Sequence, residues 1–189
     1  HAIGPTVVQR DAGAVVIVNI NGSPFYAGKG SLREKMLVTR AADNEVFVAY
    51  VNMVGGQDEL VFDGASYATN STHAERCGLI GQFETGTATV GFDLDKRRLV
   101  LPDGGCRLDR DGWHMEYRAA MLALGDYVNK NRFPGVVLGM SGGIDSALTA
   151  AIAVDALGAD RVWCVMMPSK YTSSDSLEDA KRCAEALGA

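Results

Sequence analysis

The chain has 189 residues and a mass of 20.1 kDa, with 18 Lys and Arg against 23 Asp and Glu, a net charge of −5 and 47% hydrophobic residues. That apolar content offsets chain entropy, which excludes a mainly disordered protein, and the lack of clustered Lys and Arg argues against nucleic-acid binding. No run reaches the roughly 18 apolar residues of a membrane span, and residues 1–5 lack the basic start of a signal peptide. We therefore expect a cytoplasmic protein with no membrane partner.

Apolar periodicity in the first half predicts a strand, a helix and a second strand. Residues 13–20 form a continuous β-branched run, which is typical of a strand buried on both faces. Residues 31–44 carry apolar side chains at helical spacing, and residues 46–51 predict the next strand, so we expect a βαβ-like layer. Short β-type stretches separated by turn residues then favour antiparallel pairing, at residues 60–62, 65–69, 79–83 and 87–92.

Turn-forming residues concentrate at 101–112, and we place a linker at residues 106–114, between a first domain of residues 1–105 and a second of residues 115–189. The second domain opens with a predicted helix and then alternates buried strands with helices, which indicates a parallel sheet. These elements are a helix at 115–131, a strand at 136–140, a helix at 144–157, a strand at 161–167 and a helix at 175–187.

A glycine-rich turn joins the first of these strands to its helix. Residues 139–146 are Gly-Met-Ser-Gly-Gly-Ile-Asp-Ser. The unpaired N–H groups and the positive dipole end of a helix start favour an anion, and adjacent glycines let the backbone approach it closely. Ser141 and Ser146 add hydroxyl groups, and Asp145 adds an oxygen ligand suited to Mg²⁺. This combination predicts a pyrophosphate-binding turn.

Two common phosphate-binding motifs do not fit this turn. It lacks the Lys-Ser/Thr pair that closes a P-loop and the third glycine of the dinucleotide-binding fingerprint. A plain helix N-cap with a tight turn is the alternative, and it would account for Ser141 and Gly142 but not for the Asp-Ser pair that follows.

Residues 141–146 resemble the SGGxDS signature of the PP-loop ATP pyrophosphatases. Residues 165–173, Val-Met-Met-Pro-Ser-Lys-Tyr-Thr-Ser, are similar to a loop of the NAD⁺ synthetases, and this resemblance covers nearly all of residues 115–189. Residues 19–25 and 50–66 resemble the nitrilase-type glutaminase domain of the glutamine-dependent members of that family.

The resemblance implies an α/β chain: the C-terminal half of a nitrilase-like α-β-β-α sandwich, followed by the start of a doubly wound parallel-sheet PP-loop ATP pyrophosphatase domain. It also implies ATP-dependent amidation of nicotinic acid adenine dinucleotide (deamido-NAD⁺) through an adenylated intermediate. The ammonia would come from glutamine hydrolysis. ATP and Mg²⁺ are the implied cofactors, deamido-NAD⁺ and glutamine the implied small-molecule partners, and a homo-oligomer the implied assembly.

Site residues follow from the same resemblance. Asp145 would ligate Mg²⁺, Met167 would lie near the adenine, and Ser23 and Lys29 would contact glutamine. The alternatives are strand core for Met166 and Met167, a Ser-Pro turn for Ser23, and a solvated loop cation for Lys29. The full ATP-binding set is Gly139, Met140, Ser141, Gly142, Gly143, Ile144, Asp145, Ser146 and Met167.

The family's nucleophilic Cys, with its Glu and Lys, has no counterpart in this sequence, so we assign no catalytic residue. Cys77 lies in a β-type stretch outside the family's motif and is interpreted as a structural thiol. A parallel sheet with so few strands also leaves apolar faces uncovered. We therefore expect a fragment of a longer enzyme.

Two other functions stay open. One is a different PP-loop amidotransferase or ligase, such as an asparagine- or GMP-synthetase-like enzyme, although the amidase of such an enzyme would be unrelated to the block at residues 54–60. The other is a non-catalytic nucleotide-binding module, which the missing triad permits.

The first prediction concerns activity. The 189-residue chain by itself should release no ammonia from glutamine and form no NAD⁺ at a native-like rate, because the triad is missing and the sheet is short. Assays of both products with the purified chain test this, and either activity at such a rate would overturn the expectation of a fragment.

Overall fold

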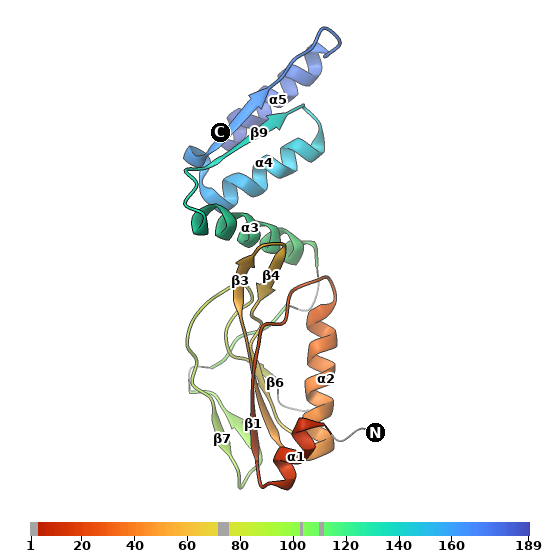
Figure 1. The fold of residues 1–189 in the computed structure, drawn as a ribbon, viewed down its shortest axis with the longest axis vertical. Coiled ribbons are helices and arrows are strands. Elements are labelled where there is room, and N and C mark those ends of the chain that lie inside the picture. The colour runs from red at the N-terminus through yellow and green to blue at the C-terminus, as the bar shows by residue number, and fades with distance from the viewer. Residues whose placement is uncertain (1–3, 72–75, 103, 110–111) are drawn as a thin grey trace. The chain divides into compact units, whose positions relative to one another are not determined.

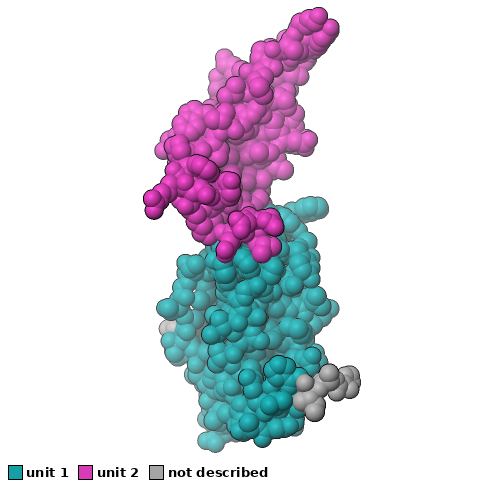
Figure 2. Space-filling model, viewed as in Figure 1, with its two compact units in different colours: residues 1–55, 61–116 teal, residues 56–60, 117–189 magenta. Residues whose placement is uncertain are grey.

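The computed structural model describes residues 4–71, 76–102, 104–109 and 112–189 (Figure 1). The chain separates into two compact units, which Figure 2 shows in different colours. Unit 1 comprises residues 1–55 and 61–116, and unit 2 comprises residues 56–60 and 117–189. None of the helices in the described ranges combines the length and the apolar character needed to cross a bilayer.

Unit 1 is built on a four-stranded sheet with strand order β1-β2-β5-β6. β1 pairs parallel to β2, and the β2–β5 and β5–β6 pairs are antiparallel. Two further pairs, β3–β4 and β7–β8, form separate two-stranded sheets. The elements are α1 (Pro5–Asp11), β1 (Val16–Asn21), α2 (Lys29–Asn44), β2 (Phe47–Asn52), β3 (Val54–Gln57), β4 (Leu60–Asp63), β5 (Tyr67–Thr69), β6 (Arg76–Gly78), β7 (Gly91–Asp93) and β8 (Arg98–Val100). Residues 56–60, which include the end of β3 and the start of β4, belong to unit 2.

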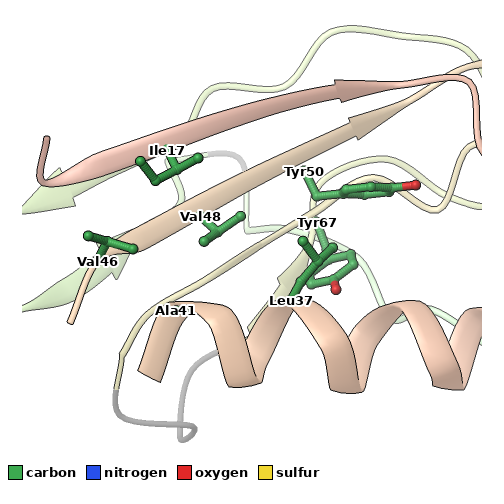
Figure 3. Packing of buried hydrophobic residues seen from close by; sticks show 7 residues of the cluster. All are labelled: Ile17, Leu37, Ala41, Val46, Val48, Tyr50 and Tyr67. Atoms are coloured by element: carbon green, nitrogen blue, oxygen red, sulfur yellow. The ribbon is translucent and has the colours of Figure 1, made fainter. Parts of the chain in front are cut away.

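The predicted βαβ layer is confirmed: α2 connects the parallel strands β1 and β2, with Ile17 opposite Val48 in the register. The hydrophobic core of unit 1 lies between this sheet and α2 (Figure 3). Its buried members come from β1, α2, β2, β5 and the residue directly before β2, and they are Ile17, Leu37, Ala41, Val46, Val48, Tyr50 and Tyr67.

The buried face of α2 contains a charged residue. Arg33, Leu37, Ala41 and Asn44 follow one another at helical spacing, and all four are buried. Leu32 is 58% exposed and lies outside this face, so the apolar spacing in the sequence indicated the helix but not its whole buried side. Because an unpaired buried charge is costly, Arg33 requires a buried partner.

The prediction that the first strand is buried on both faces is wrong. In β1, Ile17 is 9% exposed, whereas Val18 is 63% and Ile20 is 82% exposed. β1 lies at the end of the strand order, and the core with α2 occupies one face of the sheet. A continuous apolar run therefore indicated the strand, but it could not show what covers the second face.

Two of the four short β stretches also differ from prediction. No strand forms at residues 79–83, and the nearest strand, β6, ends before them at Gly78. Only the end of the 87–92 stretch belongs to β7. Phe83 has a φ of 61° and donates its N–H to the Asp63 carbonyl at 2.9 Å, which fits a turn rather than an extended strand. The predicted antiparallel pairing is confirmed for β5 and β7, which pair with β6 and β8, two strands outside the predicted stretches.

Unit 2 alternates strands and helices, as predicted. β9 and β10 pair in parallel, and Gly158 and Gly188 follow the two helices after these strands as C-caps. The elements are α3 (Trp113–Lys130), whose first residues belong to unit 1, β9 (Val136–Met140), α4 (Ile144–Leu157), a 3₁₀ turn (Ala159–Arg161), β10 (Val162–Met166) and α5 (Ser174–Leu187).

The two parallel strands are buried on one face only, so the prediction of buried strands is half wrong. Met140 and Val162 are 5% and 2% exposed and pack in the clusters beneath α4 and α5. Val137 and Trp163, paired in the register, are 70% and 49% exposed. The expectation that a short parallel sheet leaves an apolar face uncovered is confirmed for the described residues.

A pair of substitutions on α2 tests the core of unit 1. Leu37→Ala should lower the free energy of unfolding by about 2–5 kcal/mol, because it leaves a cavity between the helix and the sheet. Leu32→Ala, on the same helix but exposed, should change it by less than about 0.5 kcal/mol. Urea unfolding of both variants measures the difference, and equal effects would contradict the packing described.

Candidate functional site

A short turn connects β9 to α4 (Figure 1). Its shape depends on a glycine in the left-handed region. Gly142 has a φ of 78°, and a Cβ atom built on it would overlap the carbonyl oxygen of Ser176 in the first turn of α5. Any side chain would be strained by the backbone and would collide with another part of the backbone. The turn is thus held close to the start of α5.

The two serines of the turn fix its shape from inside. The Ser141 N–H donates to Ser146 Oγ at 3.3 Å, and the Gly143 N–H donates to Ser141 Oγ at 3.4 Å. The Ser146 hydroxyl donates to the Gly143 carbonyl at 2.9 Å. The hydroxyl groups, which the sequence indicated as donors to an anion, therefore organise the loop, and the backbone amides remain as donors.

Those amides are unpaired where α4 starts. Gly143 is the N-cap, it has extended dihedrals and no side chain caps the helix, which contradicts a capping role for Ser141. The Ala147 N–H donates to the Gly143 carbonyl. Among the residues that the structure describes, no acceptor takes the N–H of Gly142, Ile144, Asp145 or Ser146. Unpaired amides at a 14-residue helix start favour an anion.

Asp145 is an exposed acid in the first turn of α4, beside these amides. Within the described ranges, no three or more His, Cys, Asp or Glu side chains converge on a point where they could hold a metal ion. Asp145 thus fits Mg²⁺ as one oxygen ligand, with the remaining ligands coming from phosphate oxygens or water.

The other predicted nucleotide-binding residues differ from one another in exposure: some side chains face solvent and one is buried in the core. Met167 is 77% exposed, so the strand-core alternative is wrong for it, and its Cε lies 2.9 Å from the position of a Cβ on Gly139. Its side chain therefore crosses Gly139 beyond the end of β10. The Met140 side chain is buried in the core with Ala150 and Ala180 and can offer only its backbone, whereas Ile144 is 80% exposed.

In unit 1, Ser23 lies in the loop after β1 and is held by side chains from two other elements. Its N–H donates to Asn52 Oδ1 at 2.8 Å, and Asn52 Nδ2 donates to its carbonyl at 3.1 Å. Arg33 Nη2 donates to the same carbonyl at 3.3 Å and to Ser23 Oγ at 3.4 Å. These contacts go beyond what a Ser-Pro turn would require.

Lys29 is the first residue of α2 and not a loop residue. It is half-buried, and its Nζ lies 4.5 Å from the centroid of the Tyr26 ring, a cation–π contact. The structure therefore places the Lys29 ammonium group on Tyr26 and shows no direct contact between Lys29 and Ser23 in the described residues.

Sequence reasoning missed the residues that support Ser23. Arg33 and Asp63 form an ion pair with an Nη2–Oδ1 distance of 3.2 Å, and both side chains are 3% exposed. The sequence feature that could have indicated this pair is the position of Arg33 at helical spacing from the buried residues of α2. A buried arginine requires a buried acidic partner. The same burial raises the pKa of Tyr50, whose ring lies 5.6 Å from the guanidinium carbon, although the nearby positive charge opposes the shift.

Two family models match separate parts of the chain. Residues 5–100 match the carbon-nitrogen hydrolase family, and residues 116–189 match the NAD synthase family. The chain is 43% identical to the glutamine-dependent NAD(+) synthetase of Aquifex aeolicus, over 97% of its own length and 38% of that protein. It is 46% identical to the Rhodobacter capsulatus enzyme of the same name, over 94% of its length and 32% of that protein.

A solved structure is also similar. The glutamine-dependent NAD⁺ synthetase of Acinetobacter baumannii, in complex with ADP, matches with a TM-score of 0.87 and 38% identity. That match covers 99% of this chain and 35% of the other, so the chain spans about a third of the length of these relatives. Through the match that covers half its length, the chain belongs to the carbon-nitrogen hydrolase family, and its second half is the start of an NAD synthase domain.

Proposed function

We propose that the chain takes part in glutamine-dependent NAD⁺ synthesis, the ATP-dependent amidation of deamido-NAD⁺ with ammonia released from glutamine. The observation that carries this proposal is the set of unpaired amides at the start of α4, in a chain related to enzymes of that name. The domain limits at residues 1–105, 106–114 and 115–189, a cytoplasmic location and a homo-oligomeric assembly are parts of the same proposal.

The turn between β9 and α4 would hold the ATP phosphates. The amides of Gly142, Ile144, Asp145 and Ser146 supply donors that need no reorganisation when negative charge develops on the leaving pyrophosphate. Mg²⁺, when bound, would neutralise that charge, and Asp145 would hold it. The related Acinetobacter baumannii protein was solved in complex with ADP, which supports an adenine nucleotide as a ligand of this chain.

The adenine would lie beside Met167. Ligands of open parallel sheets bind beyond the carboxyl ends of the strands, and Met167 is exposed directly after β10. Its thioether crosses Gly139, where any side chain would displace it. A flexible, polarizable side chain there suits the flat face of a purine.

Glutamine would be contacted in unit 1 by Ser23 and Lys29. A hydroxyl and an ammonium group are both hydrogen-bond donors, and they suit the carboxylate and amide oxygens of glutamine. Ser23 is half-buried and fixed, whereas Lys29 would have to leave Tyr26 or extend past it. These two residues are thus given binding roles, and no residue of the chain is assigned as the nucleophile for glutamine hydrolysis.

Titration calorimetry with ATP and Mg²⁺ tests the nucleotide site. Asp145→Ala should weaken binding of the Mg²⁺ complex by about 10-fold or more, because it removes a metal ligand. Asp160→Ala, an exposed acid beyond the opposite end of α4, should leave the affinity unchanged. If the unsubstituted chain binds neither ATP nor AMP, or if both variants behave alike, the proposed site is wrong.

A pair of glycine substitutions tests the geometry of the turn. Gly142→Ala should destabilise unit 2 by more than the roughly 1–2 kcal/mol that left-handed dihedrals cost an alanine, since its Cβ also meets Ser176. Gly143→Ala has ordinary dihedrals and an ordinary 3.5 Å contact, and should cost less than about 1 kcal/mol. Thermal unfolding distinguishes the two variants. Equal losses would mean that the turn is not shaped as described.

A further inference from the structure

We propose that the buried Arg33–Asp63 ion pair is a positioning device that presents the Ser23 hydroxyl to glutamine as a hydrogen-bond donor. This inference rests on the proposed function and adds to it two positioning residues and the direction of one hydrogen bond.

The contacts of Arg33 join two separate parts of unit 1. From α2, the Nη1 atom donates to Asp63 Oδ1 and Oδ2 at 3.2 and 3.3 Å, and Nη2 donates to Oδ1 at 3.2 Å. The same Nη2 reaches the Ser23 carbonyl at 3.3 Å and Ser23 Oγ at 3.4 Å. One planar guanidinium group therefore connects the end of β4 with the loop that carries Ser23.

Stability alone is a poor reason for this arrangement. Both side chains are 3% exposed, and an ion pair so deeply buried is on average no more stabilising than apolar side chains of similar volume. Arg33 Nε also lacks a hydrogen-bond partner among the described residues, which adds a desolvation cost. What the pair does provide is a fixed direction for the hydrogen bonds, because the planar guanidinium group holds its N–H donors at set angles to their acceptors.

The chemistry of the guanidinium group sets the role of Ser23. Arginine only donates hydrogen bonds, so Ser23 Oγ is the acceptor in its contact with Arg33. The hydroxyl proton of Ser23 is then directed away from Arg33, toward an acceptor atom. Within unit 1 the Tyr50 hydroxyl, a side-chain hydrogen-bond partner of Ser23, offers such an atom, and an oxygen of glutamine would have to take its place. Ser23 would therefore meet an oxygen of glutamine rather than its ammonium group.

A second side chain, that of Asn52, also holds Ser23 in place from outside the loop. Asn52 in β2 binds both the N–H and the carbonyl of Ser23, and the Asn52 N–H is itself bound to Ser66 Oγ at 3.1 Å. The backbone of Ser23 is thus held by Asn52 and by Arg33, whereas the side chain has Arg33 and Tyr50 as its partners. Removing the arginine fork should release the hydroxyl and leave most of the backbone contacts in place.

The test uses the full-length polypeptide and compares glutamine with free ammonia as nitrogen donors for NAD⁺ formation. Arg33→Lys keeps the charge and loses the fork, and it should raise the KM for glutamine by about 10-fold or more, since small displacements of a binding group are costly. Asp63→Asn should act in the same direction. The ammonia-dependent rate should not change in either variant, and Arg40→Lys, exposed on the same helix, should alter neither rate.

A double-substitution cycle separates positioning from general stability. Once Ser23→Ala has removed the hydroxyl, adding Arg33→Lys should raise the KM for glutamine no further, whereas effects on the melting temperature should still add. Full additivity in KM would overturn the inference, and so would a loss of both rates through unfolding. If the unsubstituted protein forms no NAD⁺ from either donor, the proposed function fails and this inference fails with it.

Discussion

The turn at Gly142 is the constraint on which the candidate nucleotide site depends. Its left-handed backbone and its close approach to Ser176 bring the start of α4 beside the start of α5. The serine hydroxyl groups are used to hold this shape, so the backbone amides are left without acceptors. Donors fixed before a ligand arrives are worth more to a developing charge than donors that must reorganise.

Unit 1 shows a related use of buried polar groups. Arg33 and Asp63 form a buried ion pair, and together with Asn52 they fix a loop that has no regular structure of its own. Burying such groups costs free energy, and the cost is offset by the fixed geometry that they give to a binding group. Both units therefore hold their candidate binding groups on loops that the surrounding elements make rigid.

Features set by local sequence were predictable. The helices α4 and α5 end directly before Gly158 and Gly188, and the parallel order of β9 and β10 follows from the alternation of strands and helices. The turn at residues 139–146 combined glycines with a helix start, so its amides could be expected to lack partners. A six-residue motif was enough to indicate it.

Features set by distant contacts were not predictable. The apolar run of β1 could not reveal that Val18 and Ile20 stay exposed, because that depends on what packs on the second face. Asp63 lies 30 positions from Arg33 in the sequence, and the residues around each of them do not indicate that the two form a pair. Met167 belongs to an apolar stretch that predicts a strand, yet it lies directly after the last residue of β10 and its side chain is exposed.

The central claim is that the backbone amides at the start of α4 bind a polyphosphate. Amide NMR of the chain, titrated with pyrophosphate and Mg²⁺, tests it most directly. The account predicts saturable shifts of the Gly142, Ile144, Asp145 and Ser146 resonances, with smaller changes in the first turn of α5. Saturable shifts confined to other residues, or no shift at these four amides at any concentration, would contradict it.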